Sequence, residues 1–274
     1  MKQFFSAVGK ALVYFLILIG AQTIVPFLYG IASVITLLPQ VFENPNAVDT
    51  LLQSVSDSLL TDLGPMLLLS NLTALFLYFL TAPIRRRSLR AHFDLNPMDR
   101  RSILPLLLLG ICCNLAMNVL LGLIPFPEAW WQSYEASAEL VPMDLSVLAV
   151  FSTAFLGPFV EELCFRGLMY TRLRRAMPGI AAALISSVIF GAVHGTLIWF
   201  FYAFPLGLLM VWLFHRFGSL WASILFHMTF NLTNFLLLPL PEAAILPLSI
   251  LGCLGCAGCT FWVLRLTKPS QSRT

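Results

Sequence analysis

The chain has 274 residues, of which 59% are hydrophobic and 11% are charged, and its mean hydropathy is +0.87. A soluble domain carries about 25% charged residues, so this composition excludes a soluble globular protein and predicts an all-α transmembrane helical bundle. The formal net charge of +3 gives no reason to expect a nucleic-acid partner. The lipid bilayer is the expected partner of most of the surface.

Eight apolar stretches are long enough to cross a bilayer as helices, which takes about 20 residues each. The first could extend to Leu38, and the sixth is the shortest. Pro26, Pro158 and Pro205 should kink or break their helices, because proline removes a helical hydrogen bond. The expected spans are residues 8–30, 63–82, 103–124, 145–170, 180–199, 201–215, 219–238 and 245–264.

Basic residues gather at the same ends of these spans. In the loops at the other ends every charged residue is acidic, and Arg166 is the only basic residue that does not fall on the first side. By the positive-inside rule the basic side is cytoplasmic, so both termini are expected there. The residues on which this topology depends are Lys2 and Lys10; Arg85, Arg86, Arg87, Arg90, Arg100 and Arg101; Arg172, Arg174 and Arg175; Arg216; and Arg265, Lys268 and Arg273.

The chain divides into three expected regions. Residues 1–144 hold the first spans and a basic cytoplasmic loop, 145–240 form a core that contains most of the intramembrane polar residues, and 241–274 form the last span and a cytoplasmic tail. All six cysteines fall within expected spans, which argues against a disulfide framework. The repeat Cys253-x-x-Cys256-x-x-Cys259 is interleaved with glycines. It predicts close helix packing rather than an iron–sulfur cluster, which usually needs a fourth thiolate.

Three polar clusters interrupt the apolar spans of the core, and an ionisable group at membrane depth costs roughly 2.5–3.5 kcal/mol. The clusters are Glu161-Glu162-x-x-x-Arg166, Phe190-x-x-x-His194 and His227-x-x-x-Asn231. Such costly residues are candidates for function, and together they predict a polar cavity within the membrane. They include the carboxylates, imidazoles and amide that hydrolysis requires.

Helical spacing separates the roles of the two adjacent glutamates. Glu162 and Arg166 are four residues apart, so they lie on one helix face and are expected to pair. Glu161 points about 100° away from Glu162 and is left free for chemistry. The same spacing places His227 and Asn231 on one face, where they can hold a water, a metal ion or a carbonyl oxygen between them.

Taken together, the three clusters resemble the signature motifs of the CPBP family of intramembrane proteases, also called Abi. This family contains type II CAAX prenyl endopeptidases and bacteriocin-processing or immunity proteins, and the resemblance covers about residues 145–240. It implies a glutamate-dependent endopeptidase acting on a membrane-associated or lipidated peptide. The short, loop-poor chain looks like a bacterial member, so a multi-pass protein of a bacterial cell membrane is expected.

The resemblance also implies residue roles. Glu161 matches the catalytic glutamate and His194 its partner in activating water. His227 and Asn231 match the pair that stabilises the oxyanion. Glu162 and Arg166 match supporting positions, and Phe190 belongs to the second motif.

Two alternatives stay open at this point. Zinc could be held by His194, His227 and Glu161 with a fourth position for water, although no cofactor is expected, because there is no HExxH helix and asparagine is a poor zinc ligand. The protein could instead be non-catalytic, either a bacteriocin immunity factor or a proton-coupled transporter, since intramembrane carboxylates and histidines also form proton relays.

Overall fold

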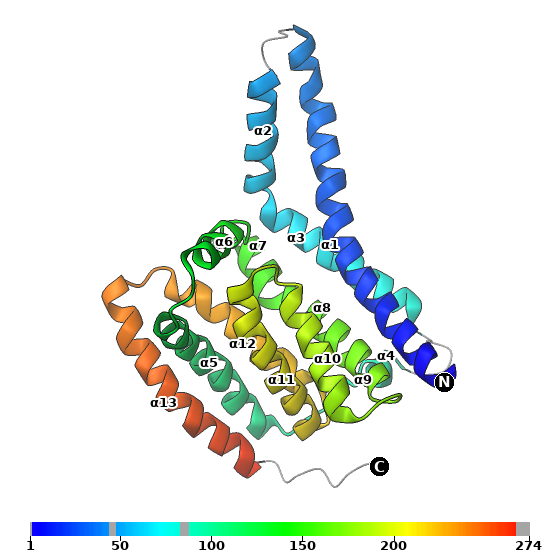
Figure 1. Ribbon diagram of the computed structural model, residues 1–274, viewed down its shortest axis with the longest axis vertical. Helices are drawn as coiled ribbons and strands as arrows, with labels where there is room; N and C mark the ends of the chain where they lie inside the picture. Colours follow the sequence, from blue (N-terminus) through cyan, green and yellow to red (C-terminus); the bar gives the residue numbers. More distant parts are fainter. Residues whose placement is uncertain (1, 44–47, 83–87, 267–274) are drawn as a thin grey trace.

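The computed structural model describes residues 2–43, 48–82 and 88–266, and every regular element in these ranges is helical (Figure 1). The predicted fold class, an all-α polytopic membrane protein, is confirmed. Of the charges used for the topology, Arg85, Arg86, Arg87, Lys268 and Arg273 lie outside the described residues. Seven helices in the described ranges are long and apolar enough to cross a membrane. They are α1 (Lys2–Glu43), α3 (Leu63–Thr81), α5 (Ile103–Leu123), a composite helix over Val147–Leu173, α11 (Leu197–Phe217), α12 (Leu220–Leu237) and α13 (Glu242–Leu266).

The fifth and sixth expected spans have different boundaries from those predicted. The short helix is α10 (Gly179–Ala192), with 14 residues, whereas α11 has 21. The chain turns at residues 193–196, so His194 lies in a turn rather than within a membrane helix. Gly195 has a φ of +89°, which a residue with a side chain adopts only with strain. Thr196 then caps α11 by accepting a hydrogen bond from the Trp199 N–H at 3.2 Å.

The N-terminal part of the chain forms a hairpin that was not predicted. α1 has 42 residues, or about 63 Å of helix, which exceeds the roughly 30 Å of a hydrocarbon core. Its second half projects past the bundle together with α2 (Val48–Thr61) (Figure 1). The two helices are in contact, and the Tyr29 hydroxyl donates to the Asp62 carboxylate. Residues 39–43 and 48–61, which were expected to lie in a loop, are therefore helical.

The fourth span is continuous but changes helix type along its length. It comprises α7 (Val147–Val150), the π-helical stretch η3 (Phe151–Leu156), α8 (Gly157–Glu162), the π-helical stretch η4 (Leu163–Tyr170) and α9 (Thr171–Leu173). Pro158 was expected to kink or break its helix, but the span stays continuous there: Pro158 lies at the start of α8, directly after the π-helical stretch η3. Single-turn π-helical stretches are frequent at functional sites.

Glycine-mediated packing of the last span is confirmed. α13 packs against α5, and an added Cβ at Gly252 would lie 2.4 Å from the Leu115 Cβ. The six cysteines are all free. Cys256 of α13 places its Sγ 3.6 Å from that of Cys113 on α5, so these cysteines belong to the contact between the two helices.

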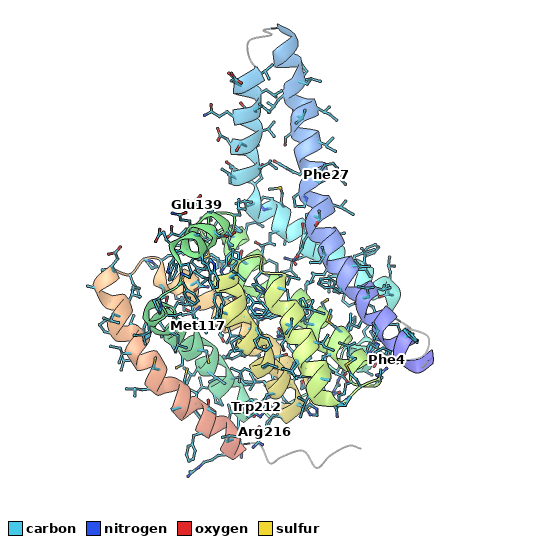
Figure 2. All side chains as sticks on the ribbon, in the orientation of Figure 1. Phe4, Phe27, Met117, Glu139, Trp212 and Arg216 are labelled. Carbon is cyan, nitrogen blue, oxygen red and sulfur yellow. The ribbon has the colours of Figure 1, made fainter. Side chains whose placement is uncertain are left out.

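The two ends of the bundle differ in charge. Glu139 lies at one end and Arg216 at the other (Figure 2). The first end, called the acidic face here, carries α6 (Glu128–Ala138), a helix that the sequence did not predict. The second, called the basic face, carries α4 (Leu89–His92), η2 (Arg100–Ser102) and α9. The basic face holds Arg90, Arg100, Arg101, Arg172, Arg174 and Arg216, and the acidic face holds Glu128, Glu135, Glu139 and Asp144.

Candidate active site

The expected ion pair of the fourth span is present and fully buried. Arg166 Nη1 lies 2.7 Å from Glu162 Oε1, and the two side chains are 1% and 0% exposed. Arg166 Nη2 also donates to the Gly207 carbonyl on α11 at 3.2 Å, and its guanidinium lies over the Phe190 ring, 4.2 Å from the centroid. The pair thus ties the fourth span to α10 and α11. Phe190 takes a supporting position in this contact by facing the cation.

His227 lies between the two glutamates. Its Nδ1 is 3.0 Å from Glu162 Oε1, and its Nε2 is 3.8 Å from Glu161 Oε2. The Glu162–His227 hydrogen bond joins α12 to the fourth span and was not predicted. Helical spacing within one span carries no signal for a contact between residues 65 positions apart.

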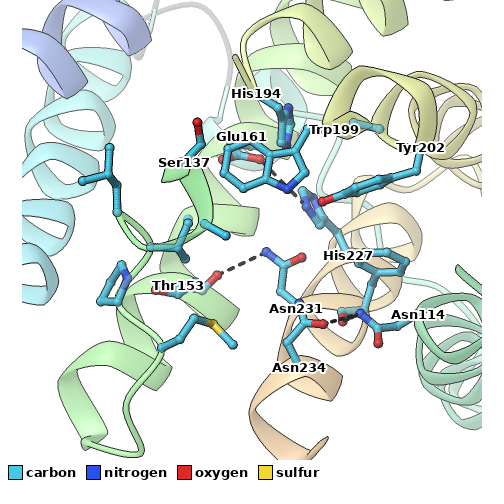
Figure 3. Close-up of a pocket in the computed structure, with 18 of the residues that line it drawn as sticks. Asn114, Ser137, Thr153, Glu161, His194, Trp199, Tyr202, His227, Asn231 and Asn234 are labelled. Atoms are coloured by element: carbon cyan, nitrogen blue, oxygen red, sulfur yellow. Dashed lines mark hydrogen bonds and ion pairs between the residues drawn. The ribbon is translucent and has the colours of Figure 1, made fainter. Parts of the chain in front are cut away.

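Glu161 differs from Glu162 in its access to solvent. Its side chain is 24% exposed and faces a cavity of about 930 Å³ within the bundle. Figure 3 shows Glu161, His194 and His227 close to one another at one side of this cavity. The structure therefore brings together one ionisable residue from each of the three clusters.

His194 is fixed through one ring nitrogen. Its Nδ1 lies 2.7 Å from the Phe190 carbonyl oxygen, which can only accept, so Nδ1 carries the proton in this arrangement. His227 Nδ1 faces the Glu162 carboxylate in the same way. In the neutral form, each imidazole then keeps an unprotonated Nε2 that can accept a proton or bind a metal. The two histidines are thereby oriented alike, although they come from different elements.

Asn231 is engaged by the backbone of the fourth span. Its Nδ2 donates to the Thr153 carbonyl at 3.2 Å. The Gly157 N–H is directed to the Ser152 carbonyl in the π-helical stretch, and Pro158 has no N–H to offer. Asn231 thus supplies the donor that the helix lacks at Thr153. Figure 3 shows this hydrogen bond between the fourth span and α12, the helix that also carries His227.

Further polar residues line the cavity that the sequence reasoning did not single out. Asn114 of α5 donates from Nδ2 to the Phe230 carbonyl at 2.9 Å and to Asn234 Oδ1 at 2.8 Å. Trp199 and Tyr202 of α11 face the same space (Figure 3). Asparagines within otherwise apolar spans were the signal that could have identified Asn114 and Asn234, because a polar group at that depth needs partners.

The zinc alternative is supported by the chemistry of the candidate ligands but not by their spacing. A zinc-bound histidine normally donates its other ring N–H to a carbonyl or carboxylate, and His194 and His227 both do so. As the side chains stand, however, no group of three His, Cys, Asp or Glu residues in the described ranges could hold a metal ion. The donor chemistry therefore fits zinc, and the spacing of the donors would have to change for the ion to be held.

Comparisons with known proteins agree with the motifs. Residues 143–233 match the family model described as type II CAAX prenyl endopeptidase Rce1-like, which confirms the predicted resemblance for this part of the chain. Over 100 residues the chain is 32% identical to "Putative membrane peptidase YdiL" of Bacillus subtilis (strain 168). That alignment covers 36% of this chain and 41% of the relative. No solved structure matches.

Proposed function

We propose, from the Rce1-like character of residues 143–233, that this protein is an intramembrane endopeptidase in which Glu161 is the catalytic base. The observation that carries the proposal is the contrast between the two adjacent glutamates. Glu162 is held by Arg166 and His227 at full burial, whereas Glu161 opens to the cavity. Only Glu161 can meet both a water molecule and a peptide bond.

The proposed reaction begins with water activation. Glu161 takes a proton from a water molecule placed between its carboxylate and the Nε2 of His194, and the oxygen attacks the scissile carbonyl. Glu161 then passes the proton to the leaving amine as the C–N bond breaks. A positioned acid–base group of this kind typically contributes about 10²–10⁴-fold to the rate.

The same proposal assigns Asn231 and His227 to the oxyanion. Asn231 Nδ2 would exchange the Thr153 carbonyl for the negatively charged oxygen. His227 can donate from Nε2 only as an imidazolium, because its Nδ1 proton is already directed to Glu162. The positive charge on that ring would face Glu161 and Glu162, whose carboxylates would stabilise the imidazolium.

Zinc remains the alternative cofactor of this proposal. His194, His227 and Glu161 would hold the ion, which supplies a bound water of lowered pKa. We place the metal-free mechanism first because it gives a role to Asn231, whose amide is a poor zinc ligand.

Comparative proteomics tests the activity. Membrane peptides from cells that carry the unsubstituted chain are compared with peptides from cells that carry Glu161→Gln, and new termini should appear only with the unsubstituted chain. Glu242→Gln is the matched control, because Glu242 is an exposed carboxylate in the first turn of α13. New termini that persist with Glu161→Gln would refute the assignment. Their absence from all three samples, with an unchanged immunity or transport phenotype, would favour a non-catalytic protein.

A second measurement addresses the metal. The purified chain is assayed on the identified peptide before and after exhaustive treatment with a strong zinc chelator. Activity should survive, and the protein should carry no stoichiometric zinc. One zinc per active chain, with activity restored by added zinc, would establish the metal alternative.

A further inference from the structure

The cavity is confined to one side of the bundle. In α5 its lining residues begin at Asn114, and in α12 they begin at Phe226, although both helices start near the basic face. In α11, which runs the other way, they end at Met210. In α3 they end at Ser70, and in the fourth span at Glu161. All five helices therefore line the cavity only with residues that lie away from the basic face.

The cavity extends to the acidic face, and the part of its lining there is called the mouth here. Tyr134 and Ser137 of α6 line it, as does the segment 140–143 that follows this helix. The acidic face carries Glu128, Glu135, Glu139 and Asp144, and the sequence has no Lys or Arg between residues 102 and 165. A peptide that approaches this mouth thus meets carboxylates first.

The opposite end of the cavity is closed by packed side chains. Glu162 and Arg166 are 0% and 1% exposed, and Phe165 and Phe190 are 0% and 1% exposed. Phe165 and Phe190 pack edge to face with ring centroids 5.1 Å apart. Glu161 therefore lies at the closed end of the cavity. Among the described residues, the cavity extends from Glu161 toward the acidic face.

We propose that the substrate reaches Glu161 from the extracytoplasmic side, through the acidic face, as an extended peptide segment that is neutral or basic. The positive-inside rule places the basic face in the cytoplasm, so the acidic face lies on the other side. A negatively charged mouth enriches cationic ligands and repels anionic ones. This inference rests on the proposed function, since it names the substrate class and the route to the same site.

The cavity walls fit an extended peptide backbone. A peptide that enters the membrane unfolded must find partners for its N–H and C=O groups, because hydrocarbon offers none. Asn114, Asn118, Asn231 and Asn234 line the cavity from the adjacent helices α5 and α12 and supply amide donors and acceptors. Asn234 is oriented by Asn114 through the 2.8 Å hydrogen bond at its Oδ1, which leaves its Nδ2 for another partner.

Thiol labelling tests the route. Met117→Cys places a thiol inside the cavity, Ser137→Cys places one at the mouth, and Arg100→Cys marks the basic face. A sulfonated, membrane-impermeant maleimide is applied to intact cells and to inverted vesicles, with the unsubstituted chain as the background for the six native cysteines. We expect Met117→Cys and Ser137→Cys to react in intact cells, and Arg100→Cys to react only in inverted vesicles.

Each other labelling pattern contradicts the proposal. Reaction of Met117→Cys only in inverted vesicles would show access from the cytoplasm. Failure of Met117→Cys to react from either side, while Ser137→Cys reacts, would show that the mouth does not lead to the cavity. The measurement needs no catalysis, so a failed route and a failed peptidase assignment remain distinguishable.

Two synthetic peptides test the charge preference. They share one apolar centre and differ in flanking lysines or flanking glutamates, and each is added outside cells that carry Met117→Cys. The lysine-flanked peptide should slow labelling at an about tenfold lower concentration, the lower end of what a charged cleft produces. The difference should shrink in 1 M salt, where the Debye length is about 3 Å. Equal protection by both peptides, or better protection by the glutamate-flanked one, would overturn the preference.

Discussion

The basic-face half and the acidic-face half of the bundle differ in how their intramembrane charged side chains are buried and paired. Toward the basic face, Glu162 and Arg166 are paired at 2.7 Å and excluded from solvent. Toward the acidic face, Glu161 is 24% exposed and its nearest ionisable partner is His227 at 3.8 Å. The two glutamates are adjacent in the sequence, so the difference arises from which side of the helix each one faces.

This contrast separates structural charge from chemical charge. A buried pair holds helices in register, and removal of one partner leaves the other without compensation. A carboxylate beside a cavity has few fixed partners and can exchange protons with whatever enters. The half that holds the buried pair should therefore respond to mutation through stability, and the cavity half should respond through turnover.

The largest expected effect is loss of turnover in Glu161→Gln. The amide cannot take a proton from water, so kcat should fall by about 10²–10⁴-fold. The thermal midpoint in detergent should stay near that of the unsubstituted chain, because Glu161 is not part of the buried pair. Glu162→Gln is the matched control one residue away, and its main effect should be a lower midpoint. A reversed outcome for these two variants would mean that the roles of the glutamates are exchanged.

The next effect is loss of folded protein in Arg166→Ala. Removal of one member of a buried ion pair typically costs about 3–5 kcal/mol, and the guanidinium here also contacts Gly207 and Phe190. The folded fraction after detergent extraction should drop sharply. The double variant Glu162→Gln/Arg166→Met removes both charges and should recover much of the yield. A well-folded, inactive Arg166→Ala protein would instead point to a direct role of Arg166 in catalysis.

The local part of this arrangement could be predicted from the sequence. The Glu162–Arg166 pair depends only on a four-residue spacing in one helix, and the long apolar spans follow from the length that a bilayer requires. The Glu162–His227 hydrogen bond depends on how α12 packs against the fourth span, and no pattern within either segment encodes it. The same holds for the cavity, whose lining residues come from α6 and from eight other helices: α1, α3, α5, the fourth span, α10, α11, α12 and α13.

Some local features were missed although the sequence carried a signal for them. The boundary between α10 and α11 lies in an apolar run, where hydropathy cannot mark a helix end. Gly195 and the capping residue Thr196 were the available signals. α2 lies outside the apolar spans, so a search for membrane length passes over it. Its apolar side chains at four-residue spacing, such as Leu51, Val55 and Leu59, were the relevant pattern.

A smaller effect is expected at Asn231, where two roles can be separated. If its amide stabilises the oxyanion, Asn231→Ala should lower kcat by about 10²–10³-fold with little change in KM. If it only satisfies the Thr153 carbonyl, the added variant Pro158→Ala should compensate, because it restores an N–H to the helix. We expect the oxyanion role, under which the restored N–H does not replace the lost amide. The double variant Asn231→Ala/Pro158→Ala should then remain as slow as Asn231→Ala alone. Recovery of turnover in the double variant would reduce Asn231 to a structural role.

The smallest effect concerns the turn that positions His194. Gly195 has a φ of +89° and open space around an added Cβ, so Gly195→Ala meets a conformational cost without a steric clash. That cost should be about 1–2 kcal/mol, seen as a lower thermal midpoint. Gly195→Asn should lose less, since asparagine tolerates positive φ. Gly20→Ala is the matched control, because Gly20 also has open space but lies inside α1. Gly195→Ala could instead be as stable as Gly20→Ala yet much slower in catalysis. The turn would then position His194 for chemistry without storing strain. In that case mutation in the cavity half would affect turnover and not stability, as the comparison of the two halves predicts.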